Sequence, residues 1–184
     1  MAQLAWVTGN WPAWILSNVP TMVSLDWLSW AKSQNAITGY AHSGWGLSPI
    51  EPAKDLPNYV LPKMDGIGAN EYIVTVTQNV VDFYSAGDTP ARWELNMWYH
   101  SLNCGFKTRL SAETDFPCIF DERVGIARSY FKTDAALNYD AYISAIKSGR
   151  LYVSDGSSHI INFSVNVLEA GTSNSELSLQ SAAT

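Results

Sequence analysis

Two polar residues, His42 and Asp115, each follow a short β-like run and precede residues typical of turns. In an α/β barrel, the catalytic groups gather at the carboxyl ends of the strands. A histidine and a carboxylate at two such ends can share one cation. We therefore predict His42 and Asp115 as ligands of a divalent metal (zinc, manganese or iron), whose identity the sequence does not specify. For His42, a structural role without a metal is the alternative.

Two further carboxylates are candidates for orienting water or ligands. Glu113 lies two positions before Asp115, so both side chains point to the same side of an extended chain. Paired carboxylates suit a divalent cation or general-base catalysis. Alternatively, Lys107 and Arg109 on the same run neutralise them as ordinary salt bridges. Glu71 opens a β-branched run, where a strand-end carboxylate facing water is at least as good an interpretation as a functional role.

The two remaining histidines favour structural roles. His100 shares a helical face with Trp93 and Met97, so we expect a buried structural histidine. His159 ends a polar turn between two β-like runs. That turn could cradle an anion, but a hairpin is the simpler interpretation.

Composition narrows the class of protein. The chain has 184 residues, of which 15% are charged and 47% hydrophobic, enough for one ordinary domain with a core. A formal net charge of −6 offers no basic surface for nucleic acid. Eight Trp and nine Tyr indicate a large aromatic core or, alternatively, a substrate cleft or an interface lined by aromatic side chains.

Cys104 and Cys118 can be bonded to each other or free. No signal peptide or membrane span is expected, and no cellular location is assigned.

Helical and β-like runs alternate along the chain. Such alternation over residues 21–150 predicts an α/β fold with a parallel sheet or barrel. From about residue 150 the pattern is β only, so we expect a partial barrel over 1–150 and the start of a β-rich domain over 151–184. A proline-rich connection covers 49–62. Helices are predicted over 21–34, from Thr89 as N-cap and Pro90 to Gly105, and over 139–149; strands are predicted over 36–41, 71–76, 106–112, 124–132, 151–153 and 160–167.

Three stretches, 41–46, 65–72 and 98–118, resemble the PHP (polymerase and histidinol phosphatase) metallohydrolases, most closely their carbaryl-hydrolase-like branch. The segment 149–156 resembles the part that follows the barrel in that branch. The resemblance covers about residues 20–180. It implies the C-terminal half of a distorted seven-stranded β/α barrel, with divalent metals at the carboxyl ends of the strands.

The resemblance assigns ligands position by position. His42 matches the histidine of the family's Ala-His-Pro segment, although Ser43 replaces the proline. Asp115 matches the aspartate of the family's Asp-x-His, whereas Pro117 stands where that histidine is expected. Glu71 matches an acidic position near the site. The early His-x-His has no counterpart before His42, so we expect the chain to be an internal piece of a longer protein.

By this resemblance, the parent protein is a hydrolase of ester, phosphoester or carbamate bonds in a small-molecule substrate, and a metal-bound water is the nucleophile. The alternative is a non-catalytic carbohydrate- or partner-binding module that kept the barrel and lost its metals. By itself, the chain is expected to be catalytically inactive and to bind metal weakly. Unpaired barrel strands would favour self-association.

Overall fold

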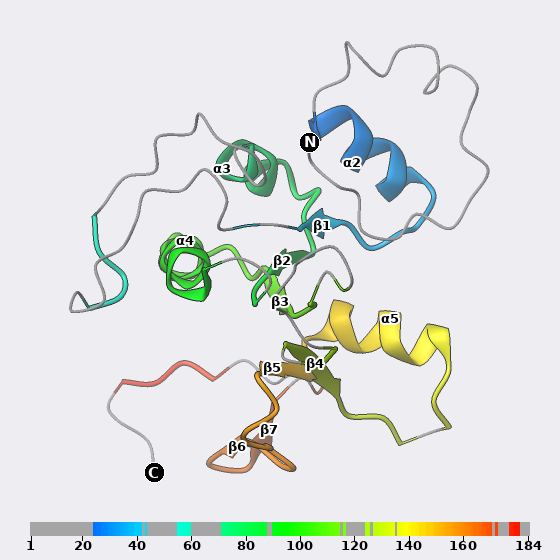
Figure 1. The fold of residues 1–184 in the computed structure, drawn as a ribbon, viewed down its shortest axis with the longest axis vertical. Helices are drawn as coiled ribbons and strands as arrows, with labels where there is room; N and C mark the ends of the chain where they lie inside the picture. Colours follow the sequence, from blue (N-terminus) through cyan, green and yellow to red (C-terminus); the bar gives the residue numbers. More distant parts are fainter. Residues whose placement is uncertain are drawn as a thin grey trace. The chain divides into compact units, whose positions relative to one another are not determined.

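The chain folds as a mixed α/β protein (Figure 1). The computed structural model describes residues 24–41, 43, 55–59, 71–87, 90–114, 116, 124–125, 127–134, 136–170, 172 and 177–180. Two compact units, residues 1–110 and 111–184, are described separately below. The α/β class expected from the sequence is confirmed. The described residues form no barrel, so the seven-stranded PHP barrel remains a prediction.

A three-stranded parallel sheet organises the first unit. Its strands are β1 (Gly39–Tyr40), β2 (Phe83–Ser85) and β3 (Arg109–Ser111), in the order β1-β2-β3. Gly39 lies opposite Phe83 in the register. A Cβ at position 39 would overlap the carbonyl oxygen and ring of Phe83, so glycine permits the close approach of β1 to β2. The strand expected over 36–41 is therefore confirmed, although its ladder is short.

Three helical segments accompany this sheet (Figure 1). Helix α2 (Ser24–Ser33) and helix α4 (Ala91–Asn103) confirm two predicted helices. Helix α4 begins one residue later than expected, with Pro90 rather than Thr89 at the N-cap. It ends before Gly105, whose φ of +88° is accessible mainly to glycine. Because α4 runs from the end of β2 to the start of β3, it makes the crossover that parallel strands require.

The strand predicted over 71–76 is wrong. This segment forms helix α3 (Tyr72–Thr75) and the 3₁₀ turn η2 (Val76–Gln78). Its buried residues are Tyr72, Thr75 and Val76, whose spacing is that of one helical face, whereas Ile73 and Val74 are exposed. The Thr75 hydroxyl also donates to the Glu71 carbonyl oxygen, as threonine does within helices. Packing of this face outweighs the β-propensity of the run.

An acidic side chain fixes the start of β1 against β2. Asp82 accepts hydrogen bonds from the Thr38 backbone N–H at 2.8 Å and from Lys32 Nζ at 2.5 Å. The Thr38 hydroxyl donates to the Val80 carbonyl oxygen at 2.6 Å. Strand β2 itself was not expected from the sequence. The Asp82 contacts thus join the end of α2, the start of β1 and the approach to β2.

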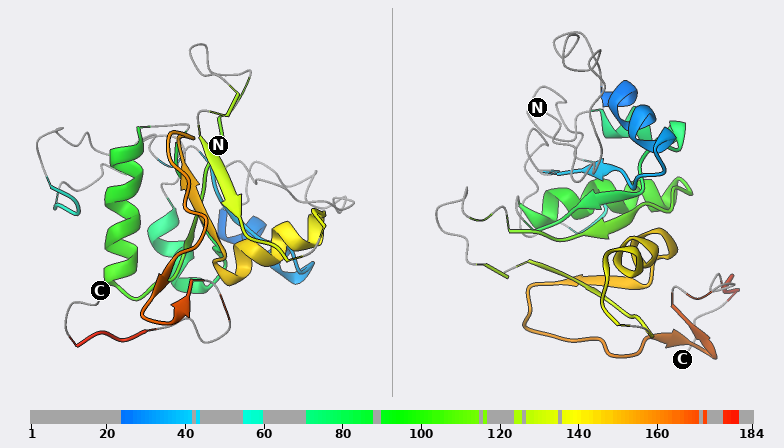
Figure 2. Two further views of the ribbon diagram at one scale, coloured as in Figure 1. Left: turned by 90° about the horizontal axis from the view of Figure 1, so that it is seen from below. Right: turned by 90° about the vertical axis from the view of Figure 1, so that its right-hand side faces the viewer.

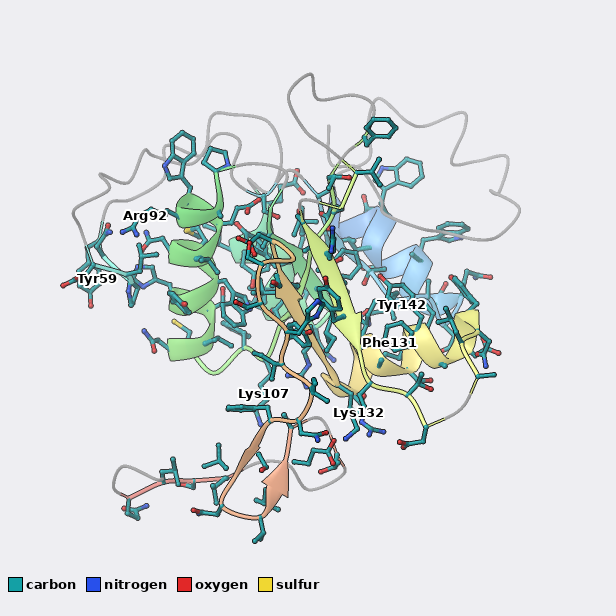
Figure 3. The ribbon with its side chains drawn as sticks, turned by 60° about the horizontal axis from the view of Figure 1, so that its bottom comes forward. Tyr59, Arg92, Lys107, Phe131, Lys132 and Tyr142 are labelled. Carbon is teal, nitrogen blue, oxygen red and sulfur yellow. The ribbon has the colours of Figure 1, made fainter. Side chains whose placement is uncertain are left out.

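The second unit is built on an antiparallel pair of strands. Strand β4 (Arg128–Phe131) pairs with β5 (Leu151–Ser154), and helix α5 (Tyr139–Ser148) lies along the pair (Figure 2). The Phe131 and Tyr142 rings lie 5.4 Å apart, centroid to centroid (Figure 3). The Asn138 side chain caps α5 by accepting from the Ala141 N–H at 2.8 Å. These elements confirm the helix predicted to end at Gly149.

The C-terminal part differs from expectation in its pairing. Strand β5 pairs with β4, so the hairpin predicted around His159, between runs 151–153 and 160–167, is wrong. In place of one long strand, the short pair β6 (Ser164–Val165) and β7 (Leu168–Glu169) forms a separate ribbon. The positive φ of Asn166 makes the tight turn of that ribbon. The domain boundary placed at residue 150 stays a prediction.

Candidate functional site

The predicted metal ligands, His42 and Asp115, lie outside the residues that the structure describes, as does Pro117. The neighbours of His42 are described. Tyr40 and Ser43 are buried, with 1% and 0% of their surfaces exposed. The Tyr84 hydroxyl donates to the Ser43 carbonyl oxygen at 3.1 Å. Strand β2 therefore anchors the backbone of the turn that follows β1.

A buried carboxylate that the sequence analysis did not identify lies beyond the carboxyl end of β2. Glu94, in the first turn of α4, is fully buried, and its Oε2 accepts from the Gly87 N–H at 2.8 Å. A carboxylate in this position is favoured by the positive end of the helix dipole. The sequence signal was a glutamate in the first turn of a helix with apolar residues on two sides. Such a helix is packed on two sides, but the burial of this carboxylate depends on its tertiary partner Gly87, which spacing alone does not reveal.

Burial and charge keep the nearby phenols protonated. Desolvation raises the pKa of Tyr84 well above its usual value, and the charge of Glu94 raises it further. Desolvation also raises the pKa of Tyr72, whose ring centroid lies 4.5 Å from that of Tyr84. The Tyr72 hydroxyl donates to Thr108 Oγ1 at 3.1 Å. These phenols act as hydrogen-bond donors in the core and are poorly suited to form tyrosinate.

The two further carboxylate candidates, Glu71 and Glu113, have different surroundings. Glu71 is exposed and immediately precedes helix α3, so the strand-end position expected for it is wrong. Glu113 follows β3 by two residues and is half-buried. It accepts from the Ser111 hydroxyl at 3.2 Å, and its charge is one reason, after desolvation, why the pKa of Tyr142 is raised. Of the two, Glu113 is the less exposed.

The described histidines have structural partners. His100 is half-buried, and its Nε2 lies 2.8 Å from the Asn58 carbonyl oxygen. His159 Nδ1 lies 3.2 Å from the Tyr152 hydroxyl. Within the described part of the chain, no three His, Cys, Asp or Glu side chains come together as a metal site.

Among the described helices, none is long and apolar enough to cross a membrane.

Comparisons with known proteins identify no family for this chain. No known protein family matches the sequence, no curated protein matches it, and no solved structure matches the fold.

Proposed function

We propose that this chain contributes metal ligands to a PHP-type hydrolase that cleaves ester, phosphoester or carbamate bonds in a small-molecule substrate. His42 and Asp115 are the proposed ligands of a divalent zinc, manganese or iron ion. When bound, such an ion lowers the pKa of a coordinated water and polarises the substrate oxygen. Glu113 is proposed to orient water or a ligand, and Glu71, exposed beside α3, is the weaker candidate.

The parallel order of the strands is the observation that supports this proposal best. His42 comes two residues after the end of β1, and Asp115 comes four residues after the end of β3. Strands β1, β2 and β3 are neighbours in one parallel sheet. Parallel neighbours end at the same edge of a sheet, and α/β enzymes bind ligands outside that edge.

The same edge has a rigid polar support. Strand β2, between the other two, carries the Tyr84 bond to the Ser43 carbonyl and leads to the Gly87 bond with buried Glu94. Buried, satisfied hydrogen bonds of this kind hold catalytic ligands in fixed positions. We therefore expect Tyr84→Phe to weaken metal binding indirectly, by loosening the turn that contains His42.

The alternative, a carbohydrate- or partner-binding module without metal, draws support from Pro117 and from the wealth of aromatic residues. A hydrolysis assay distinguishes the hydrolase from the binding module. The longest natural form of the protein that contains this chain is assayed with p-nitrophenyl acetate, p-nitrophenyl phosphate and a p-nitrophenyl carbamate, with added Mn²⁺ or Zn²⁺. Metal-dependent turnover that is lost in Asp115→Ala supports the hydrolase. Absence of both bound metal and turnover favours the binding module.

A further inference from the structure

A hollow of about 430 Å³ lies within the second unit. It is formed by the Lys132 end of the β4–β5 pair and by the segment 160–170, which returns past this end (Figure 3). The segment is tied to β4 through Lys132 Nζ, which contacts Asn162 Oδ1 at 3.0 Å and Glu169 Oε1 at 2.6 Å. The volume falls within the range of small-molecule sites.

One cation in this hollow, Arg150, has a buried N–H without an acceptor among the described residues. Arg150, with 24% of its side chain exposed, bonds Asp134 only at 3.4 Å, and its Nη2 lies 3.9 Å from Glu169. Its Nε is buried and has no acceptor among the described residues. A guanidinium has five N–H donors, and buried donors in native proteins are nearly always paired. The geometry therefore leaves Nε in need of an acceptor, and Nη2 has only its long contact with Glu169.

Lys132 differs from Arg150 because its charge is already matched. Its 2.6 Å contact with Glu169 is a close ion pair, whereas both contacts of Arg150 with carboxylates are long. The charged residues lining the hollow are Lys132, Arg150 and Glu169, which together carry one net positive charge. Asp134 pairs with Arg150 from outside the lining, so the hollow suits a ligand with no more than a single negative charge. A dianion such as a phosphate monoester would be repelled by Glu169.

The other walls are aromatic and aliphatic. Tyr130 and Tyr152 stack with centroids 4.9 Å apart and rings tilted by only 8°. Ile160, Ile161 and Phe163 also line the hollow while remaining 49%, 83% and 56% exposed. A flat apolar body between these walls would remove part of that surface from water, which is favourable in proportion to the area covered.

We propose that this hollow binds small aromatic monocarboxylates. The carboxylate accepts side by side from Nε and Nη2 of Arg150, the fork geometry that guanidinium and carboxylate share. Because Nε is covered in the free protein, the guanidinium turns slightly to reach the ligand. The aromatic body lies against the tyrosine pair and the Ile160–Phe163 segment. This site is separate from the proposed hydrolase function and does not depend on it.

The test is isothermal titration of the full chain with 2-naphthoate, alongside its neutral analogue 2-naphthalenemethanol. We expect saturable 2-naphthoate binding and at least tenfold weaker binding of the alcohol, since hydrogen bonds to charged groups contribute more than neutral ones. In ¹H–¹⁵N spectra, the Nε–Hε signal of Arg150 should shift with the same affinity. Equal binding of the two compounds, or no saturable binding of 2-naphthoate at millimolar concentration, would overturn the proposal.

Variants locate the site. Arg150→Gln should weaken 2-naphthoate binding at least tenfold. Lys147→Gln removes the same charge from an exposed position of helix α5, outside the lining of the hollow, and should change affinity less than threefold. Ala170→Trp, which fills the hollow and leaves Arg150 in place, should block binding even if Arg150→Gln does not fold. Wild-type affinity in Arg150→Gln or in Ala170→Trp would place the ligand elsewhere and refute the assignment.

Discussion

Removing the carboxylate of Asp82 tests how β1 is held against β2. In Asp82→Ala, the Thr38 N–H loses its 2.8 Å acceptor, and Lys32 loses its ion-pair partner. Thr38 is 1% exposed, so water cannot easily replace the lost acceptor. Both effects destabilise the first unit.

The size of the effect follows from the burial of each partner. Leaving a buried N–H unsatisfied costs about 1–3 kcal/mol. The Lys32–Asp82 pair is partly exposed, at 29% and 19% for the two side chains, so it contributes about 0.2–1 kcal/mol after solvent screening. We expect Asp82→Ala to lower the free energy of unfolding by about 2 kcal/mol. Asp82→Asn keeps an oxygen acceptor for Thr38 and should cost about 1 kcal/mol or less.

Urea unfolding followed by tryptophan fluorescence is the assay. All eight tryptophans lie in residues 1–98, so the signal reports the first unit. Lys32→Gln is the matched control, because it removes the ion pair and leaves the Thr38 bond intact. Asp82→Ala should be the most destabilised variant, and Asp82→Asn and Lys32→Gln should both lose less stability. An Asp82→Ala protein within 0.5 kcal/mol of wild type would refute this account of the contact.

Three further predictions concern other parts of the fold. Gly39→Val should lower stability by more than 2 kcal/mol in the same urea assay, because its Cβ would overlap Phe83 backbone. Since the pKa of Tyr84 is raised by burial, the contribution of this phenol to the unfolding free energy should be constant below about pH 10 and should fall as the pH rises further. Tyr84→Phe should reduce that alkaline loss. Asn138→Ala removes the cap on the Ala141 N–H and should cost about 1 kcal/mol in thermal unfolding followed by circular dichroism.

Elements with strong local signals were predictable from the sequence. Helix α5 has both an Asn138 cap and a terminal Gly149 with φ +77°, and α2 has a regular apolar face. Segments with conflicting signals were not. The β-branched run 72–75 became a helix because tertiary contacts bury one helical face. Strand β2, at Phe83–Ser85, is too short for the two-residue alternation of a strand to be recognised in the sequence.

The candidate site was only partly foreseeable. Local pattern placed His42 and Asp115 after β-like runs, and β1 and β3 are indeed strands that precede them. The Glu94 support depends on its hydrogen bond from Gly87, which follows from tertiary structure rather than from spacing. The Arg150 hollow likewise depends on the return of segment 160–170 past β4 and β5. Pairing of distant segments is what a single sequence does not specify.

Titration of Zn²⁺ and Mn²⁺ into the 184-residue chain tests the central claim most directly. The claim is that His42 and Asp115 bind one divalent ion. Catalytic zinc sites normally have three protein ligands, so two firm ligands predict a Kd weaker than micromolar. Alanine substitution of either residue should weaken binding at least tenfold, whereas His159→Ala, a matched loss of an exposed histidine, should not. Metal binding of unchanged affinity in both His42→Ala and Asp115→Ala would contradict the account.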